Sequence, residues 1–156
     1  MFHEIHTEGI AERARTPEIR GLLRRFQSCA TPDGYARFED FNLAQLEEYS
    51  NSLMLLTPDG GDNYLYLHFG REIASGAGID MTGRRVSDLP EGVHHFTRDS
   101  YDRVTRENVP LYSVHRSSSA MQVSLWERLV LPVRSVSGQR FVMVFTKAFQ
   151  FREELL

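Results

Sequence analysis

The sequence predicts an α+β domain in which N-terminal helices precede a curved antiparallel sheet of five strands with a helical crossover. Three observations predict this order. Apolar residues recur at helical spacing near the N-terminus. Two strand-like runs then flank a loop rich in Gly and Asp, and three further strand-like runs occupy the C-terminal third. The length of 156 residues is typical of one domain.

Composition narrows the class of protein. Hydrophobic residues make up 41% of the chain and charged residues 25%, which is typical of a globular domain. The formal net charge of −3 offers no basic excess for nucleic acid, so we expect no nucleic-acid partner. The polar N-terminus resembles no signal peptide, and no apolar run is long enough for a bilayer. With Cys29 as the single cysteine, we expect a cytoplasmic protein without membrane contact.

Two helices are predicted first. Thr16 fits an N-cap and Pro17 the first helical position, so a helix begins there and ends before the turn residues 31–34. Its apolar stripe comprises Ile19, Leu22, Leu23 and Phe26. A second helix is expected from Asp40 to about Tyr49.

A hairpin and a crossover follow. Apolar runs at 52–57 and 64–69 flank a loop of Pro, Asp, Gly and Asn, which predicts a β-hairpin. A short helix is expected over 71–77. A longer one, with its apolar face at helical spacing, should begin near Val93 and stop at Asn108.

The final meander is predicted from three runs, 111–116, 122–134 and 140–149. Every residue from Phe141 to Phe145 is hydrophobic, so these strands do not alternate and both faces of the sheet must be covered. The crossover helices can cover one face. The other needs the N-terminal helices, a second subunit, or both, and we expect a homodimer contact to form part of this cover.

Three segments carry a resemblance to a known family. Residues Tyr66–Ile73 resemble the second strand and first crossover helix of bacterial PAS domains, and Gly78–Arg84 is similar to their G-x-D-[ML]-T-G-R segment. Residues Trp126–Pro132 resemble their fourth strand. The resemblance extends from about Leu43 to Phe149.

The resemblance implies a division of the chain. Residues 1–42 would be an N-terminal helical extension, 43–149 the PAS-like sensory domain, and 150–156 the start of a C-terminal linker helix. It also implies a bacterial regulatory domain that dimerises through its N-terminal helices and outer sheet face. Such a domain relays a signal, with or without a small ligand in an internal cavity, to an effector such as a histidine kinase or a diguanylate cyclase.

Several side chains could line such a cavity, because they join an apolar body to a polar tip. The candidate ligand-binding residues are Tyr66, His68, His95, Tyr101, Tyr112, His115 and Arg128. Strict alternation would place Tyr64, Tyr66 and His68 on one face of their strand and Leu65, Leu67 and Phe69 on the other. The sequence leaves open which set faces the cavity, and also whether the tyrosines only pack in the core.

Cofactor chemistry is weakly indicated, and no cofactor is required. His94 and His95 precede the long helix, where a haem-binding PAS domain places its iron ligand, so a haem-based gas sensor is one alternative. The other interpretation is that both are surface residues. Flavin photochemistry is disfavoured, because Cys29 lies far upstream of the segment 81–89 that should hold the reactive cysteine. The acidic residues fit no calcium loop, so no metal is expected.

We expect the chain not to be an enzyme. It has no G-x-S-x-G elbow, no phosphate-binding Gly-rich loop and no H-E-x-x-H motif. A further alternative is a small cone-shaped α+β enzyme of the isomerase or dehydratase sort. The order of the strands distinguishes such an enzyme from a PAS-like domain, because such enzymes lack an early hairpin followed by a helical crossover into a meander.

Overall fold

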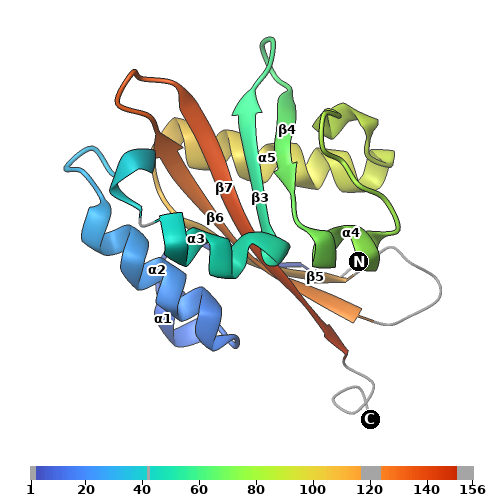
Figure 1. The fold of residues 1–156 in the computed structure, drawn as a ribbon. Helices are drawn as coiled ribbons and strands as arrows, with labels where there is room; N and C mark the ends of the chain where they lie inside the picture. The colour runs from blue at the N-terminus through green and yellow to red at the C-terminus, as the bar shows by residue number, and fades with distance from the viewer. Residues whose placement is uncertain (1–2, 42, 117–123, 151–156) are drawn as a thin grey trace.

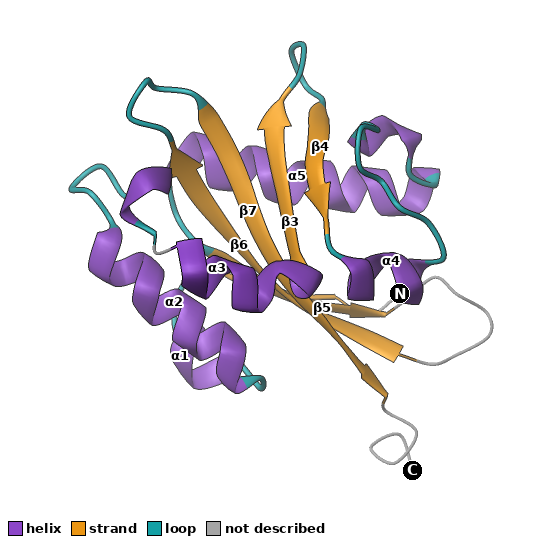
Figure 2. Cartoon of the chain, viewed as in Figure 1, coloured by secondary structure: helices purple, strands orange, loops and turns teal. Residues whose placement is uncertain are grey.

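The computed structural model describes residues 3–41, 43–116 and 124–150 as one open sheet with helices packed on both faces (Figures 1 and 2). The strands are β1 (His3–His6), β2 (Ala36–Arg37), β3 (Leu53–Pro58), β4 (Tyr64–Phe69), β5 (Leu111–Arg116), β6 (Ser124–Arg134) and β7 (Arg140–Gln150). The helices are α1 (Ile10–Arg13), α2 (Pro17–Cys29), α3 (Leu43–Tyr49), α4 (Arg71–Ala77) and α5 (Glu91–Glu107). Short 3₁₀ turns are η1 (Phe38–Asp40), η2 (Ser50–Ser52) and η3 (Val86–Asp88).

The α+β class is confirmed, whereas the expected number of strands is wrong. The sheet runs β1-β5-β6-β7-β3-β4, and β2 pairs with β6 off this path, which makes seven strands. The early hairpin β3–β4 joins the sheet through β3, which pairs antiparallel with β7. The hairpin and the final meander therefore belong to one sheet, and α4, η3 and α5 connect them.

The two additional strands lie in the segment expected to be helical. Strand β1 pairs antiparallel with β5 and extends that edge of the sheet, with Ile5 opposite Ser113. Strand β2 pairs in parallel with the end of β6, with Ala36 opposite Val133. Strand β1 has four residues and β2 has two, which is too short for a periodic pattern that would predict a strand. Both strands form because a neighbouring strand offers unpaired backbone groups.

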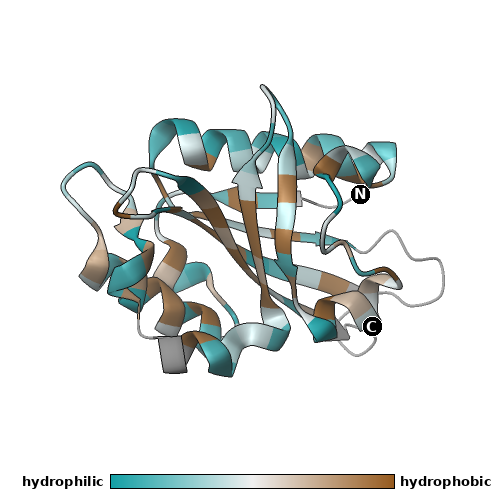
Figure 3. Ribbon diagram, turned by 45° about the horizontal axis from the view of Figure 1, so that its top comes forward, coloured by the Kyte–Doolittle hydropathy of each residue, from teal (hydrophilic) through white to brown (hydrophobic). Residues whose placement is uncertain are grey.

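Strand β6 divides two cores by simple alternation. Leu129, Leu131 and Val133 belong to the cluster under α1 and α2, whereas Val130 belongs to the cluster on the side of α4 and α5. All four are buried. Figure 3 shows hydrophobic residues concentrated along the strands, while the loop between β3 and β4 is hydrophilic. Both faces are thus covered, as the apolar runs predicted.

The face of the sheet opposite α4 and α5, called the outer face below, is covered by helices of the same chain. Ile19, Leu22, Leu23 and Phe26 of α2 are all buried against the cluster that contains Leu129. The stripe read from the sequence is therefore the contact surface of this helix. Because one chain already buries this face, the burial argument no longer requires a second subunit, and the homodimer stays a prediction.

A bulge in β4 changes which side chains share a face. Leu55 pairs with His68 and Leu56 with Tyr66, so Leu67 is the extra residue between them. Tyr66 and Phe69 consequently join the same cluster on the α5 side. His68 turns to the opposite side. The expectation that Tyr64, Tyr66 and His68 share one face is wrong for His68.

The segment 150–156, expected to begin a linker helix, lies outside the described residues except for Gln150, which ends β7. Among the residues that the structure describes, no helix combines the length and the apolarity needed to cross a membrane.

Candidate functional site

A pocket of about 450 Å³ lies between the sheet and the crossover helices α4 and α5. Its walls are mostly apolar: Met54, Phe69, Ile73, Val93, Phe96 and Trp126 contribute side chains from both layers. Trp126 lies directly against Gly76 of α4, where a Cβ atom would stand 2.6 Å from the indole. The volume and the apolar lining fall in the range of small-molecule sites, about 300–1,000 Å³.

Arg128 supplies the charge at the inner end of the pocket. Strand β6 directs this side chain towards α5, and only 3% of the residue is exposed. Its Nε donates a hydrogen bond to Ser113 Oγ at 3.1 Å, and its Nη2 donates one to Ser100 Oγ at 2.9 Å. The guanidinium also lies over the rings of Phe96 and Tyr101, 4.9 Å and 5.5 Å from their centroids.

The contacts of Arg128 fix the position of its guanidinium but do not neutralise its positive charge. None of the ion pairs found among the described residues includes Arg128. No aspartate or glutamate is among the described residues that line the pocket. Burial lowers the pKa of Arg128, and Tyr101 and Tyr66 partly offset that effect. An arginine side chain nonetheless remains protonated in proteins, so the pocket contains a buried positive charge.

Two tyrosines place their hydroxyl groups close to this cation. Tyr101 is 0% exposed, and its hydroxyl lies near Tyr66 and Arg128 without a hydrogen bond of good geometry to any described residue. Burial raises the pKa of Tyr101, and Arg128 is the largest influence that opposes this rise. Burial likewise raises the pKa of Tyr66. Both tyrosines therefore stay neutral at physiological pH and can donate hydrogen bonds.

Four of the seven residues proposed from the sequence meet in this pocket. Tyr66, Tyr101, His115 and Arg128 all line it. They come from β4, α5, β5 and β6, so the fold unites residues that are far apart in the chain.

The other three candidates lie elsewhere. His68 faces away because of the bulge, and its Nε2 is 2.9 Å from the carbonyl oxygen of Ser50. His95 is exposed on α5, with its Nδ1 3.4 Å from Arg98 Nη2. Tyr112 is buried in the cluster on the opposite face of the sheet. The expectation that His94 and His95 precede the long helix is wrong, because α5 begins at Glu91 and contains both. Neither of them lines the pocket, so the histidines proposed for haem are not at the cavity.

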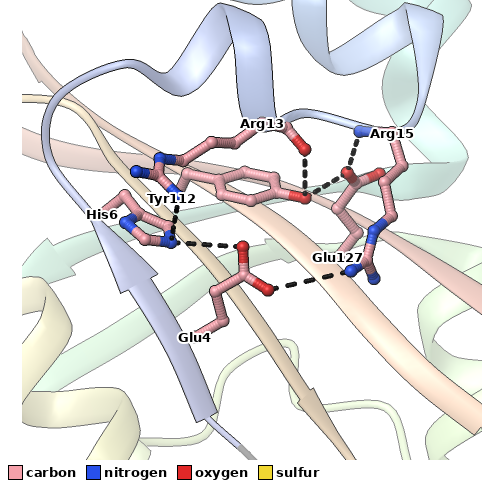
Figure 4. A network of polar contacts seen from close by, with 6 residues as sticks. All are labelled: Glu4, His6, Arg13, Arg15, Tyr112 and Glu127. Carbon is pink, nitrogen blue, oxygen red and sulfur yellow. Dashed lines mark hydrogen bonds and ion pairs between the residues drawn. The ribbon is translucent and has the colours of Figure 1, made fainter.

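Tyr112 belongs to a second buried polar site, centred on Glu127 (Figure 4). Glu127 is 0% exposed and precedes Arg128, so it points to the opposite face of the sheet. Its Oε2 accepts hydrogen bonds from the Tyr112 hydroxyl and from the backbone N–H of Arg15 at 2.6 Å. Its Oε1 accepts from the hydroxyl and, at 3.1 Å, from the backbone N–H of Thr16.

The rest of this network ties the N-terminal segment together. His6 Nε2 lies 3.2 Å from Glu4 Oε1, and the guanidinium of Arg15 lies 3.8 Å from Glu4 Oε2. Glu127 thus holds the backbone at the junction between α1 and α2, just where α2 begins. The network is structural in character, because it fixes the N-terminal helices to the sheet.

Sequence reasoning missed the residues that complete both sites. Ser100 and Ser113 position Arg128, and nothing in their sequence context distinguishes them from surface serines. Glu127 did carry a signal, because a glutamate beside an arginine within an otherwise apolar strand predicts two buried charges.

Within the described parts of the chain, no group of three or more histidines, cysteines or acidic residues could hold a metal ion. The sequence matches no protein-family model and none of the curated proteins with which it was compared.

Proposed function

We propose that this chain is a regulatory sensor domain of the PAS type, which binds a small ligand in the pocket and relays its presence to an effector. The observation that carries the proposal is the pocket itself. It is apolar, it is of ligand size, and it contains a buried cation, the buried hydroxyl of Tyr66, and the buried hydroxyl of Tyr101, for which no hydrogen-bond partner is found among the described residues. Proteins rarely leave buried polar groups in this state unless they serve a function.

The strand order supports the choice of family. Within the larger sheet, the strands β4-β3-β7-β6-β5 are neighbours in that order. A hairpin, a helical crossover and a three-stranded meander generate it, which is the order expected of PAS domains. The same feature argues against the cone-shaped enzyme alternative, which lacks an early hairpin followed by such a crossover.

The three resembling segments also lie around the pocket. Tyr66–Ile73 forms the end of β4 and the start of α4, and both contribute lining residues. In Gly78–Arg84 the carboxylate of Asp80 accepts hydrogen bonds from the backbone and side chain of Thr82, which forms the turn beside α4. Trp126–Pro132 lies in β6 and supplies Arg128.

Relay to an effector would use the N-terminal cap. Strand β6 carries Arg128 into the pocket and Glu127 into the contact with the start of α2, so one strand touches both sites. We propose that occupancy of the pocket changes the position or the stability of the N-terminal helices, through which a homodimer or a neighbouring effector domain would respond.

Native mass spectrometry of freshly purified protein tests ligand binding and reports the subunit count. We expect a bound small molecule in the wild type and its loss in Val93→Phe, because Val93 lines the pocket. The matched control is Val136→Phe, in the exposed turn between β6 and β7. Equal retention of the molecule by both variants would place binding outside the pocket.

Hydrogen exchange tests the relay. Protein as purified is compared with protein stripped of ligand by denaturation and refolding. We expect slower exchange over residues 10–29 when the ligand is present. Identical exchange in this segment, together with altered exchange in α5, would contradict the proposed route through β6.

A further inference from the structure

The chemistry of the pocket indicates the charge of the ligand. Arg128 is a full positive charge with 3% exposure, and no described carboxylate is paired with it. An isolated buried charge is costly to maintain, because burial removes its hydration. The bound state of such a site is normally one in which an opposite charge replaces the lost water.

The two serines accept hydrogen bonds from only two of the N–H groups of the Arg128 guanidinium. Of its five N–H groups, the Nε group donates to Ser113 and one Nη2 group to Ser100. The hydroxyl of Tyr101 lies close enough to interact with the guanidinium, and no ion pair to a described carboxylate occupies the remaining N–H groups. These two serines fix the plane of the guanidinium, and a fixed planar fork matches the two oxygens of a carboxylate.

The neighbouring hydroxyls fit the same ligand group. The Tyr101 hydroxyl is buried without a hydrogen bond of good geometry, next to Arg128. The Tyr66 hydroxyl lies beside it, and both belong to the lining of the pocket. Neutral phenols donate well to anions, so a negatively charged oxygen here would accept from one cation and from the two tyrosines.

The remainder of the pocket decides between kinds of anion. Met54, Phe69, Ile73, Val93 and Phe96 surround the volume outside the polar end. These side chains would solvate a hydrocarbon or aromatic body and not a second charge. A phosphate, which carries up to two charges, would have one of them unpaired at the buried end, because Arg116, the other arginine of the lining, is exposed to solvent.

We propose that the ligand is a small organic monocarboxylate with an apolar body, whose carboxylate binds Arg128, Tyr101 and Tyr66. This inference rests on the proposed function, because it specifies the ligand of the same pocket. The body of the ligand extends from Arg128 towards Trp126 and Ile79, where the lining reaches α4 and the following loop.

Matched probe pairs test the proposal by isothermal titration calorimetry. The carboxylates are phenylacetate and octanoate, and their neutral counterparts are phenylacetamide and octanamide. We expect the carboxylates to bind at least tenfold more tightly than the amides to the wild-type protein. In Arg128→Met we expect the affinity for carboxylates to fall about 10- to 100-fold, to that of the amides.

A second arginine provides the control variant. Arg106 is exposed on α5 outside the lining of the pocket, and Arg106→Gln changes the charge of the molecule as Arg128→Met does. We expect Arg106→Gln to alter carboxylate affinity less than threefold. An equal loss in both variants would show that binding follows net charge and would overturn the assignment to Arg128.

The outcomes separate this inference from the proposed function. If the amides bind as tightly as the carboxylates, the pocket binds ligands but does not recognise charge, so the carboxylate assignment is wrong and the sensor proposal stands. Failure of all four probes, together with no co-purified molecule in native mass spectrometry, would overturn both.

A structural role for Arg128 makes a different prediction. If Arg128 only stabilises the packed interior, Arg128→Met should lower the unfolding temperature of the ligand-free protein. If it is held for a ligand, removal of an unpaired buried charge should leave that temperature unchanged or raise it. Arg128→Lys keeps the charge without the planar fork, and we expect intermediate carboxylate affinity.

Discussion

Glu127 shows how much one buried carboxylate can determine. It accepts hydrogen bonds from two backbone N–H groups and two hydroxyls, and all of these donors lie at the base of the N-terminal helices except Tyr112. A carboxylate with four donors is well satisfied, so it costs less to bury than an isolated charge. The same arrangement makes any replacement expensive, since the donors would remain buried.

We expect Glu127→Gln to lower the free energy of unfolding by about 2–3 kcal/mol, because an amide NH₂ would face backbone N–H groups. Urea denaturation followed by circular dichroism measures this change. Glu107→Gln is the matched control, since Glu107 is exposed on α5 and pairs only with surface arginines. Its effect should stay within about 0.5 kcal/mol. Equal effects of the two substitutions would show that the buried carboxylate of Glu127 does not stabilise the fold.

The buried tyrosines make stability depend on alkaline pH. Burial and the hydrogen bond to Glu127 raise the pKa of Tyr112, and burial and the hydrogen bond to Asp102 raise the pKa of Tyr64. In the unfolded chain both ionise near pH 10, whereas in the folded protein they keep their protons to higher pH. Their contribution is therefore complete below about pH 10 and is lost as the pH rises further.

Urea midpoints measured between pH 8 and pH 11.5 check this dependence. We expect a plateau up to about pH 10 and a decline above it. The double variant Tyr64→Phe and Tyr112→Phe should decline less steeply, because it releases fewer protons on unfolding. A wild-type midpoint that is constant across this range would contradict the assignment.

At the scale of elements, helices and paired strands were predictable where periodicity is strong. The stripe on α2 identified that helix and its buried face, and the apolar runs of β5 to β7 identified three strands that are covered on both faces, because those patterns reflect the surfaces that the elements bury. Strands β1 and β2 were not predictable. They depend on the edge of β5 and the end of β6, which are remote in sequence.

The candidate site was predictable in part for the same reason. Tyr66, Tyr101, His115 and Arg128 are amphipathic residues in strong elements, and they reached the pocket. The prediction for His68 was wrong because one extra residue, Leu67, reverses the alternation of side chains after it. Tyr112 was assigned to the cavity although β5 turns it to the face of Glu127. No single-sequence pattern reveals a bulge or the facing of a two-sided apolar strand.

The junction between β4 and α4 yields a prediction about an element boundary. At Gly70 a Cβ atom would stand 2.4 Å from the carbonyl oxygen of Asn51, which is backbone and cannot rotate away. We expect Gly70→Ala to destabilise the protein by about 1–3 kcal/mol through overpacking. Thermal and urea unfolding measure the effect.

Gly92 offers the opposite case in α5. A Cβ atom there meets nothing within 4 Å, and the residue has helical backbone in the first turn of α5. We expect Gly92→Ala to stabilise by about 0.5–1 kcal/mol, because alanine loses less backbone entropy in a helix. If both substitutions shift stability in the same direction, the contact at Asn51 is not the determinant.

For the whole molecule, the central question is what covers the outer face of the sheet. Helices α1 and α2 supply that cover from within the chain, and the residues beneath them include Leu129, Leu131 and Phe145. Exposure of this face would present a large apolar patch to water.

We expect a variant without residues 1–30 to form larger assemblies than the full chain and to bind a hydrophobic dye, whereas the full chain binds little dye at the same concentration. Multi-angle light scattering and dye fluorescence measure the two properties. A truncated chain that stays monomeric and dye-free would mean that α2 does not seal this face. A full chain that scatters as a dimer would confirm the homodimer predicted from the sequence.

Two adjacent residues of β6 carry opposite charges to buried sites on the two faces of the sheet. Glu127 serves the site under α2, and Arg128 serves the site under α5. The peptide bond between them is rigid, so a twist of this strand that improves the surroundings of one charge alters the surroundings of the other. Substitutions at these two positions should therefore be non-additive in stability, although their side chains never meet.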